Sequence, residues 1–305
     1  MGNGKFGGHF YPGLYIFFYG LYQAMLVSKA MIVSDSPVYI SSLPKIKKRC
    51  SKLNISYGGW LKIVTGSLLT FYVVICLDDG MVLINKEMPP RFMYPQEWQH
   101  LTMFILLTLD GCVDVMSKNV LRQRLVLLER GATVLGIYML LLLLVSHVQA
   151  SSKVELWVHS LLILVVFLLM LVLTAELWAP EMFHLWVIET FLFLMMGSWL
   201  MHTAFILFRP VSGFPWKDED ISDIMFVTTF FCWHVMINAL CMVGIYGISS
   251  FWHHCYSPSL RLMGSEEALY HESSSGTLCK LLQEAEHQDK DDQALLTKSS
   301  PCDRA

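Results

Sequence analysis

The chain contains eleven histidines, and six of them come from six different apolar segments. These six are His9, His100, His147, His159, His202 and His234. Neutral imidazole is a favoured ligand for zinc, copper and iron, and histidine also transfers protons near neutral pH. Histidines in such segments could therefore bind a divalent metal ion or a haem, or could relay protons.

Carboxylates also occur within the apolar segments. Asp110 and Asp114 are four residues apart, which places them on the same face of a helix. Glu176 and Glu189 lie in two later segments. Ionisable groups inside a bilayer are costly and are candidates for function. Their role depends on which segments cross the membrane.

The composition is that of a polytopic membrane protein. Of the 305 residues, 54% are hydrophobic and 15% are charged, whereas a soluble domain carries about a quarter charged residues. A membrane-crossing helix needs about 20 mainly apolar residues. Seven segments meet this condition, at residues 11–33, 59–77, 98–117, 125–147, 156–178, 183–208 and 223–250. We therefore predict an all-α fold, a seven-helix transmembrane bundle with a disordered C-terminal tail.

Two terminal regions flank the predicted bundle. We expect a short outer N-terminus over residues 1–10, the seven-span transmembrane domain over residues 11–250, and the disordered tail over residues 251–305. The tail is polar, acidic and rich in serine. Because such a composition buries too little apolar surface to fold, disorder is the expected state.

The tail carries two signals for membrane traffic. Asp291, Leu295 and Leu296 fit the acidic dileucine pattern that endosomal sorting adaptors bind. Cys255 follows the last span and is a candidate for palmitoylation. The expected partners are the lipid bilayer, sorting adaptors bound to the tail, and a second copy of the chain in a homo-oligomer.

The basic residues predict the orientation of the chain. The first loop between spans holds five basic residues in "PKIKKRCSK", and residues 118–124 add three, against six on the opposite side. Since cytoplasmic loops carry the excess of Lys and Arg, we predict an outer or lumenal N-terminus and a cytosolic C-terminus.

This orientation separates the polar groups by depth. The six histidines lie in the outer half of the membrane, and the four carboxylates lie in the inner half. Lys62, Glu129 and Arg130 fall near the cytosolic ends of their helices. We expect their long side chains to reach outward to the interface.

Two interpretations of the histidines remain open. In the first, which we favour, they are interfacial polar residues that contribute only to helix packing. In the second, His100, His159, His202 and His234 line a metal or haem site or a proton relay. No pair of histidines four residues apart and no cluster of cysteine with histidine defines a particular metal.

Several functional classes lack support. The net charge is −3 and no block is strongly basic, so nucleic-acid binding has no electrostatic basis. Glycine-rich phosphate loops and an adjacent Ser/His/Asp pattern are missing from the sequence. The last span contains no lysine, which excludes a retinal Schiff base there. No catalytic activity can be assigned.

An ordered set of motifs resembles the transmembrane protein 45 family, and its epididymal branch in particular. The motifs are "GHFYPG", "WQHLTMF…DGCVD", "HSLL", "GSWL…FILFRP" and "MFVTTFFCWH", which together extend over about residues 7–250. The resemblance implies a seven-span protein of secretory and endosomal membranes with no established biochemical activity.

The resemblance also bears on the histidines. Family histidines are implied at His9, His100, His147, His159 and His234. Gln149 and Trp157 stand where the family has a second histidine, and His202 stands where glutamine is usual. These departures weaken the expectation of a working metal site.

We therefore carry two functional hypotheses. The first is a non-enzymatic multi-pass protein of secretory, endosomal or plasma membranes that acts through trafficking or assembly with partners. The alternative is a metal- or haem-binding membrane oxidoreductase or transporter that uses the outer histidines.

Overall fold

The computed structural model describes residues 2–34, 57–75, 82–84, 89–120, 126–148, 152–180, 182–211, 213–214, 216 and 220–256. The described residues up to 249 form one compact unit. The first inter-span loop and the sorting motif of Asp291, Leu295 and Leu296 lie outside the described residues. The predicted disorder of the tail therefore stays a prediction.

Seven α-helices make up the described chain. They are α1 (Gly2–Ser34), α2 (Tyr57–Ile75), α3 (Pro95–Val115), α4 (Val126–His147), α5 (Lys153–Trp178), α6 (Phe183–Phe208) and α7 (Ile221–Tyr256). A π-helical turn, η1 (Met116–Val120), continues α3. Extended pairing in the described part is limited to one bridge between Ile84 and Phe92. The prediction of an all-α fold is confirmed.

Six of these helices, α2 to α7, are long and apolar enough to cross a membrane. The first helix is not among them, and its six glycines, several tyrosines and Pro12 lower its hydropathy. It begins at Gly2, nine residues before the predicted span, so that His9 lies within the helix. The other helices agree closely with the predicted segments, and α6 has the predicted bounds.

The first and sixth helices make the most extensive helix contact of the bundle. Glycines allow this approach. A Cβ atom on Gly197 would lie 2.3 Å from the Phe17 backbone nitrogen, and one on Gly13 would lie 2.8 Å from the Met201 nitrogen. Small residues at membrane helix interfaces permit such close packing of backbones. The order of these contacts makes α1 and α6 antiparallel.

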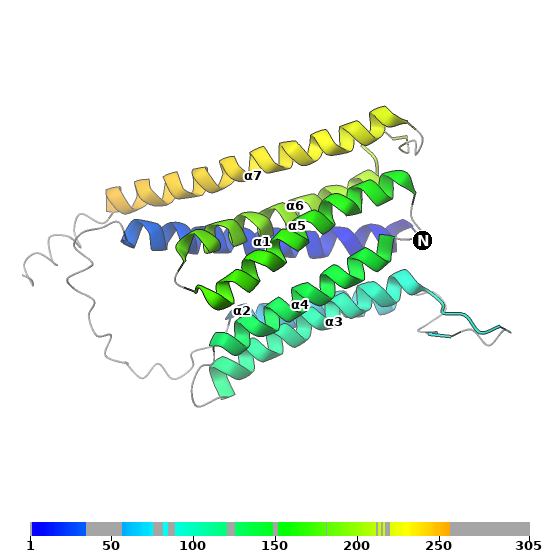
Figure 1. The fold of residues 1–305 in the computed structure, drawn as a ribbon, viewed down its shortest axis with the longest axis horizontal. Helices are drawn as coiled ribbons and strands as arrows, with labels where there is room; N and C mark the ends of the chain where they lie inside the picture. The colour runs from blue at the N-terminus through cyan, green and yellow to red at the C-terminus, as the bar shows by residue number, and fades with distance from the viewer. Residues whose placement is uncertain are drawn as a thin grey trace, which may run out of the picture. The chain divides into compact units, whose positions relative to one another are not determined.

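Helices that follow one another in sequence, from α2 to α6, also pack together and alternate in direction (Figure 1). The starts of α1, α3 and α5 therefore share one end of the bundle with the ends of α4 and α6. We call this the histidine end. The opposite end, with the start of α2 and the ends of α3 and α5, is the carboxylate end.

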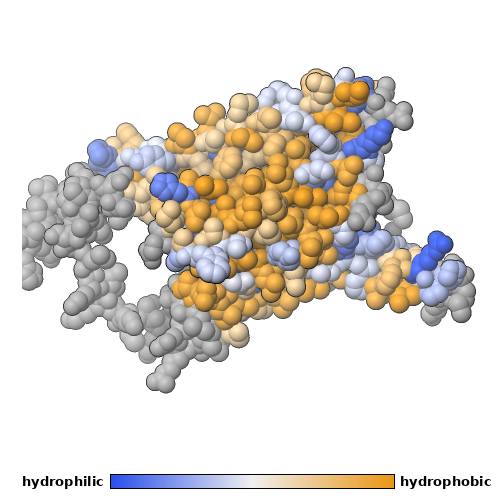
Figure 2. All heavy atoms as spheres, viewed as in Figure 1, coloured by the Kyte–Doolittle hydropathy of each residue, from blue (hydrophilic) through white to orange (hydrophobic). Residues whose placement is uncertain are grey.

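The core and the surface of the bundle are both apolar. Val158, Val166, Leu169 and Trp199 are among its most buried side chains, and the Trp199 indole donates to the Val158 carbonyl. Large apolar side chains are also exposed on every helix, and they cover the visible face of the helices in Figure 2. An exposed apolar surface of this extent is suited to contact with lipid.

Candidate metal centre

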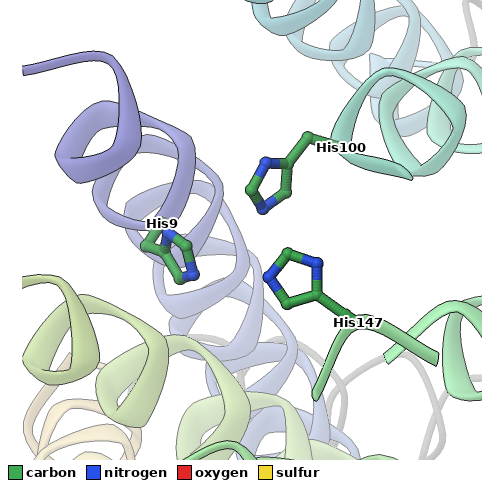
Figure 3. Close-up of side chains that lie close together, drawn as sticks. All are labelled: His9, His100 and His147. Atoms are coloured by element: carbon green, nitrogen blue, oxygen red, sulfur yellow. The ribbon is translucent and has the colours of Figure 1, made fainter. Parts of the chain in front are cut away.

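Three histidines from three helices converge at the histidine end. One ring nitrogen each of His9 on α1, His100 on α3 and His147 on α4 lies within 4.8 Å of the others. Figure 3 shows the three rings directed toward a common point. His9 and His147 are buried, and His100 is partly buried.

A fourth histidine adjoins this group. The ring of His159 on α5 has its centroid 5.4 Å from that of His147 and 5.6 Å from that of His9. Its Nε2 atom is buried and has no hydrogen-bond partner among the described residues. We refer to His9, His100, His147 and His159 as the histidine cluster.

Backbone carbonyls fix the protonation pattern of two members. Nδ1 of His9 lies 3.0 Å from the Lys5 carbonyl oxygen, and Nδ1 of His159 lies 2.8 Å from the Glu155 carbonyl oxygen. A carbonyl oxygen only accepts, so each Nδ1 carries the hydrogen. In the neutral ring, Nε2 then has a free lone pair. Metal-binding histidines in proteins are oriented in this way.

A chain of side-chain hydrogen bonds likewise fixes the hydrogen of His147 on Nδ1. The Ser146 hydroxyl donates to the Leu143 carbonyl, and the Gln99 amide nitrogen donates to the Ser146 oxygen at 2.8 Å. The Gln99 oxygen therefore faces His147 Nδ1, at 2.8 Å, and accepts its hydrogen. Nε2 of His147 is again left with a lone pair.

The dimensions of the cluster suit a transition-metal ion after a small adjustment. Zinc binds histidine nitrogens at 2.0–2.1 Å in a tetrahedron, which sets its ligand atoms about 3.3 Å apart. The three ring nitrogens lie within 4.8 Å of one another. Side-chain movements of about an ångström would bring them to bonding distance.

A cavity of about 190 Å³ begins at the histidine cluster, all four members of which line it. Lys62, Asp110 and Thr133 line its other end, and most side chains between are aliphatic or aromatic. Ten residues of α3 separate His100 from Asp110, which corresponds to about 15 Å. We call this the histidine cavity.

Charged residues gather at the carboxylate end. Lys62 Nζ lies 2.7 Å from Asp110 Oδ2 and 2.9 Å from Asp114 Oδ2. The Thr133 hydroxyl donates to Asp110 Oδ1 at 3.0 Å. The prediction that the two aspartates share one helix face is confirmed, because one ammonium group binds both.

The expectation that Lys62, Glu129 and Arg130 reach outward is wrong. Lys62 is only 9% exposed, and Glu129 only 7%. Glu129 accepts a hydrogen bond from Ser117, and Arg130 forms an ion pair with Glu176. Partners inside the bundle offset the desolvation of these charges, so the side chains turn inward.

The structure divides the predicted metal ligands into two groups. His100 and His159 belong to the histidine cluster. His202 and His234 instead contact each other, with Nδ1 of His202 2.9 Å from Nε2 of His234. His202 lines a different cavity from the cluster, between α6 and α7.

Two cluster members, His9 and His147, are missing from the predicted metal site. Two features of the sequence could have identified them as ligands: their predicted depth in the outer half of the membrane and the family pattern of histidines. The palmitoylation candidate Cys255 is exposed near the end of α7.

Comparison with known proteins places the chain in a family. Residues 127–247 match a family of unknown function (DUF716). Over 304 residues the chain is 75% identical to Transmembrane epididymal protein 1A of Mus musculus and 73% identical to Transmembrane epididymal protein 1 of Rattus norvegicus, covering 99% of this chain and 100% of each relative. It is 69% identical to Transmembrane epididymal protein 1 of Homo sapiens, over 89% of this chain and 100% of that protein. The chain therefore belongs to the family of transmembrane epididymal proteins, which are multi-pass membrane proteins.

Proposed function

We propose that this protein binds a transition-metal ion of the zinc class through the histidine cluster. The carrying observation is the convergence of ring nitrogens of His9, His100 and His147 within 4.8 Å. The fourth histidine, His159, offers a buried Nε2 without a partner among the described residues. Imidazole ligands suit zinc, copper, iron and nickel.

The arrangement favours a bare ion over a haem. A haem takes its axial ligands from the two faces of a wide macrocycle. Three or four imidazoles that approach one point leave no room for such a ring between them. Four imidazoles also complete a tetrahedral shell, whereas catalytic zinc sites keep a position open for water. Binding or transfer of the ion is thus better supported than hydrolysis.

Metal loading of the purified protein tests this function. The protein in detergent is stripped with a chelator and reloaded with Zn²⁺ or Co²⁺, and metal content and the visible spectrum of cobalt are measured. We expect one ion per chain and a spectrum typical of tetrahedral cobalt. Replacement of His147 or His159 by glutamine should weaken binding by more than about tenfold.

The control variant is His184→Gln, because His184 is exposed at the start of α6. It should bind the ion as the unmodified protein does. Helix content by circular dichroism distinguishes loss of ligands from loss of the fold. Protein that stays free of metal after loading, or equal binding by all three variants, would contradict the proposal.

We further propose the orientation that the basic residues predict, with the N-terminus outside or lumenal and the C-terminus cytosolic. The support is the excess of Lys and Arg in the first loop and at residues 118–124. Epitope tags at the two ends, probed in intact and permeabilised cells, test it. An N-terminal tag that antibodies cannot reach in intact cells, but reach once the plasma membrane alone is permeabilised, lies in the cytosol. This result would reverse the orientation.

A role in trafficking of secretory or endosomal membranes is proposed from the tail alone. Asp291 precedes Leu295 by four residues, as the acidic dileucine pattern requires. Replacement of Leu295 and Leu296 by alanine should move the protein between internal membranes and the cell surface. Leu281 and Leu282 provide a matched control, because no acidic residue precedes them at that spacing. An unchanged distribution would count against adaptor binding.

A further inference from the structure

A second cavity lies at the carboxylate end. It measures about 320 Å³, and Glu176 and Glu189 both line it. We call it the carboxylate cavity. It shares Tyr19, Lys62 and Thr133 with the lining of the histidine cavity. The two cavities therefore adjoin, and together they extend from the histidine cluster to the buried acids.

Glu176 is the most buried acid of this cavity, with 2% of its surface exposed. Its Oε2 atom pairs with the Arg130 guanidinium, which stacks over the Trp186 ring. Its Oε1 atom is buried and receives no hydrogen bond from the described residues. A buried acceptor without a donor is costly. A hydrogen-bond donor on this side would therefore stabilise the carboxylate.

A second acid, Glu189 on α6, lines the same cavity as Glu176. Two ionised carboxylates cannot form a hydrogen bond, since neither has a hydrogen. A single proton on Glu189 would donate to Glu176 Oε1 and satisfy it. Two carboxyl groups that share a site disfavour double ionisation, so that one of them keeps its proton.

The balance of charges in the carboxylate cavity is compatible with one protonated acid. The helices α1 to α6 and the π-helical turn η1 each contribute a titratable or charged group to the lining: Tyr19 of α1, Lys62 of α2, Asp114 of α3, Lys118 of η1, Glu129 and Arg130 of α4, Glu176 of α5 and Glu189 of α6. Four acids here face three permanent cations, and Lys62 also binds Asp110. Not all of these acids have a cation of their own.

We propose that Glu189 is a proton-exchange residue: it shares a proton with Glu176 and releases it when a divalent ion from the histidine cluster enters the adjoining cavity. This inference rests on the proposed metal function. The carboxyl O–H bond breaks, the proton leaves to water, and the new carboxylate faces the ion. Entry of the ion into the carboxylate cavity would then be coupled to release of one proton.

The first test is independent of metal. Infrared difference spectroscopy of the full-length protein in detergent detects the C=O stretch of a protonated carboxyl group. We expect this band near neutral pH and expect Glu189→Gln to remove it. Glutamine keeps the size and the hydrogen-bond donor of the protonated acid, so the fold should be preserved. Absence of the band, or its persistence in Glu189→Gln, overturns the proposal.

The second test concerns coupling. Unmodified protein and Glu189→Gln are placed in vesicles that contain a pH-sensitive dye, and Zn²⁺ is added outside. The unmodified protein should move protons when zinc is added, and the variant should bind the same amount of zinc without proton movement. Asp220→Asn, at an exposed position just before α7 that lines neither the histidine cavity nor the carboxylate cavity, is the control and should behave as the unmodified protein. Equal proton movement in Glu189→Gln overturns the proposed proton exchange at Glu189. Absence of zinc binding by the unmodified protein overturns the proposed metal function, and the infrared result then decides whether Glu189 holds a proton.

Discussion

The Gln99 side-chain oxygen on α3 lies 2.8 Å from Nδ1 of His147 on α4. An amide on one helix thereby sets which nitrogen of a neighbouring histidine carries the hydrogen. Two further cluster members, His9 and His159, are held in the same tautomer by backbone carbonyls. The ligand atoms are oriented before any ion binds, which reduces the cost of binding one.

Replacement of Gln99 by alanine should weaken metal binding by about 10- to 100-fold, because His147 loses the acceptor that orients it. Isothermal titration with Zn²⁺ measures the change. Gln23→Ala is the matched control, since Gln23 donates to the Tyr19 hydroxyl instead of a histidine. Equal affinities of the two variants would show that the chain of hydrogen bonds through Gln99 does not orient the cluster.

His202→Gln and His234→Gln should leave metal binding by the cluster unchanged. These two histidines contact each other, and His234 Nδ1 lies 3.1 Å from the Ser198 hydroxyl instead of facing the cluster. Zinc content after loading is the measurement, with His159→Gln as the variant that should lose the ion. Loss of zinc from His202→Gln would indicate a single larger site.

Replacement of Lys62 by methionine should destabilise the protein by about 3–5 kcal/mol, because Asp110 and Asp114 would remain buried without their cation. Thermal unfolding in detergent, followed by circular dichroism, reports the change. A triple variant that also converts both aspartates to asparagine should recover much of the loss.

Lys153→Met is the control for this series, since Lys153 is exposed at the start of α5. It should change stability by less than about 0.5 kcal/mol, as surface substitutions usually do. A small effect of Lys62→Met, similar to that of the control, would mean that the aspartates find other partners or take up protons.

Gly197→Ala should destabilise the bundle by about 1–3 kcal/mol, because the added methyl group would overlap the backbone of α1. The Cβ atom would lie 2.3 Å from the Phe17 nitrogen. Gly244→Ala on α7 meets no atom within 4 Å and should be neutral or stabilising by up to about 1 kcal/mol. Thermal unfolding measures the difference in stability between the two variants. Equal stability would mean that α1 and α6 lie farther apart than the structure shows.

The fold was predictable because its signal is local. A run of about 20 apolar residues specifies a spanning helix wherever it occurs, and six of the seven predicted segments became helices that meet this condition. The start of α1 was missed because the glycines and Asn3 of its first turns are poor helix formers in isolation. Packing against α6 stabilises them in the helix.

The site was only partly predictable. The depth of a residue in the membrane follows from its position along a span, but the direction in which its side chain points does not. Alternation of the spans places the histidines at one end. Which of them face a common point depends on how each helix is rotated about its axis, and this is set by contacts such as that of Gly197 with Phe17. The inward turn of Lys62 has the same origin, because its partners Asp110 and Asp114 belong to another helix.

The extensive contact between α1 and α6 has a consequence for biosynthesis. The first helix leaves the ribosome well before the helix that holds it, whereas α3, α4 and α5, which carry the other three cluster histidines, are made in between. His9 can therefore be secured in the cluster only after the sixth helix has entered the membrane. A nascent chain halted before α6 would lack this last ligand, which makes completion of the centre a late event in assembly.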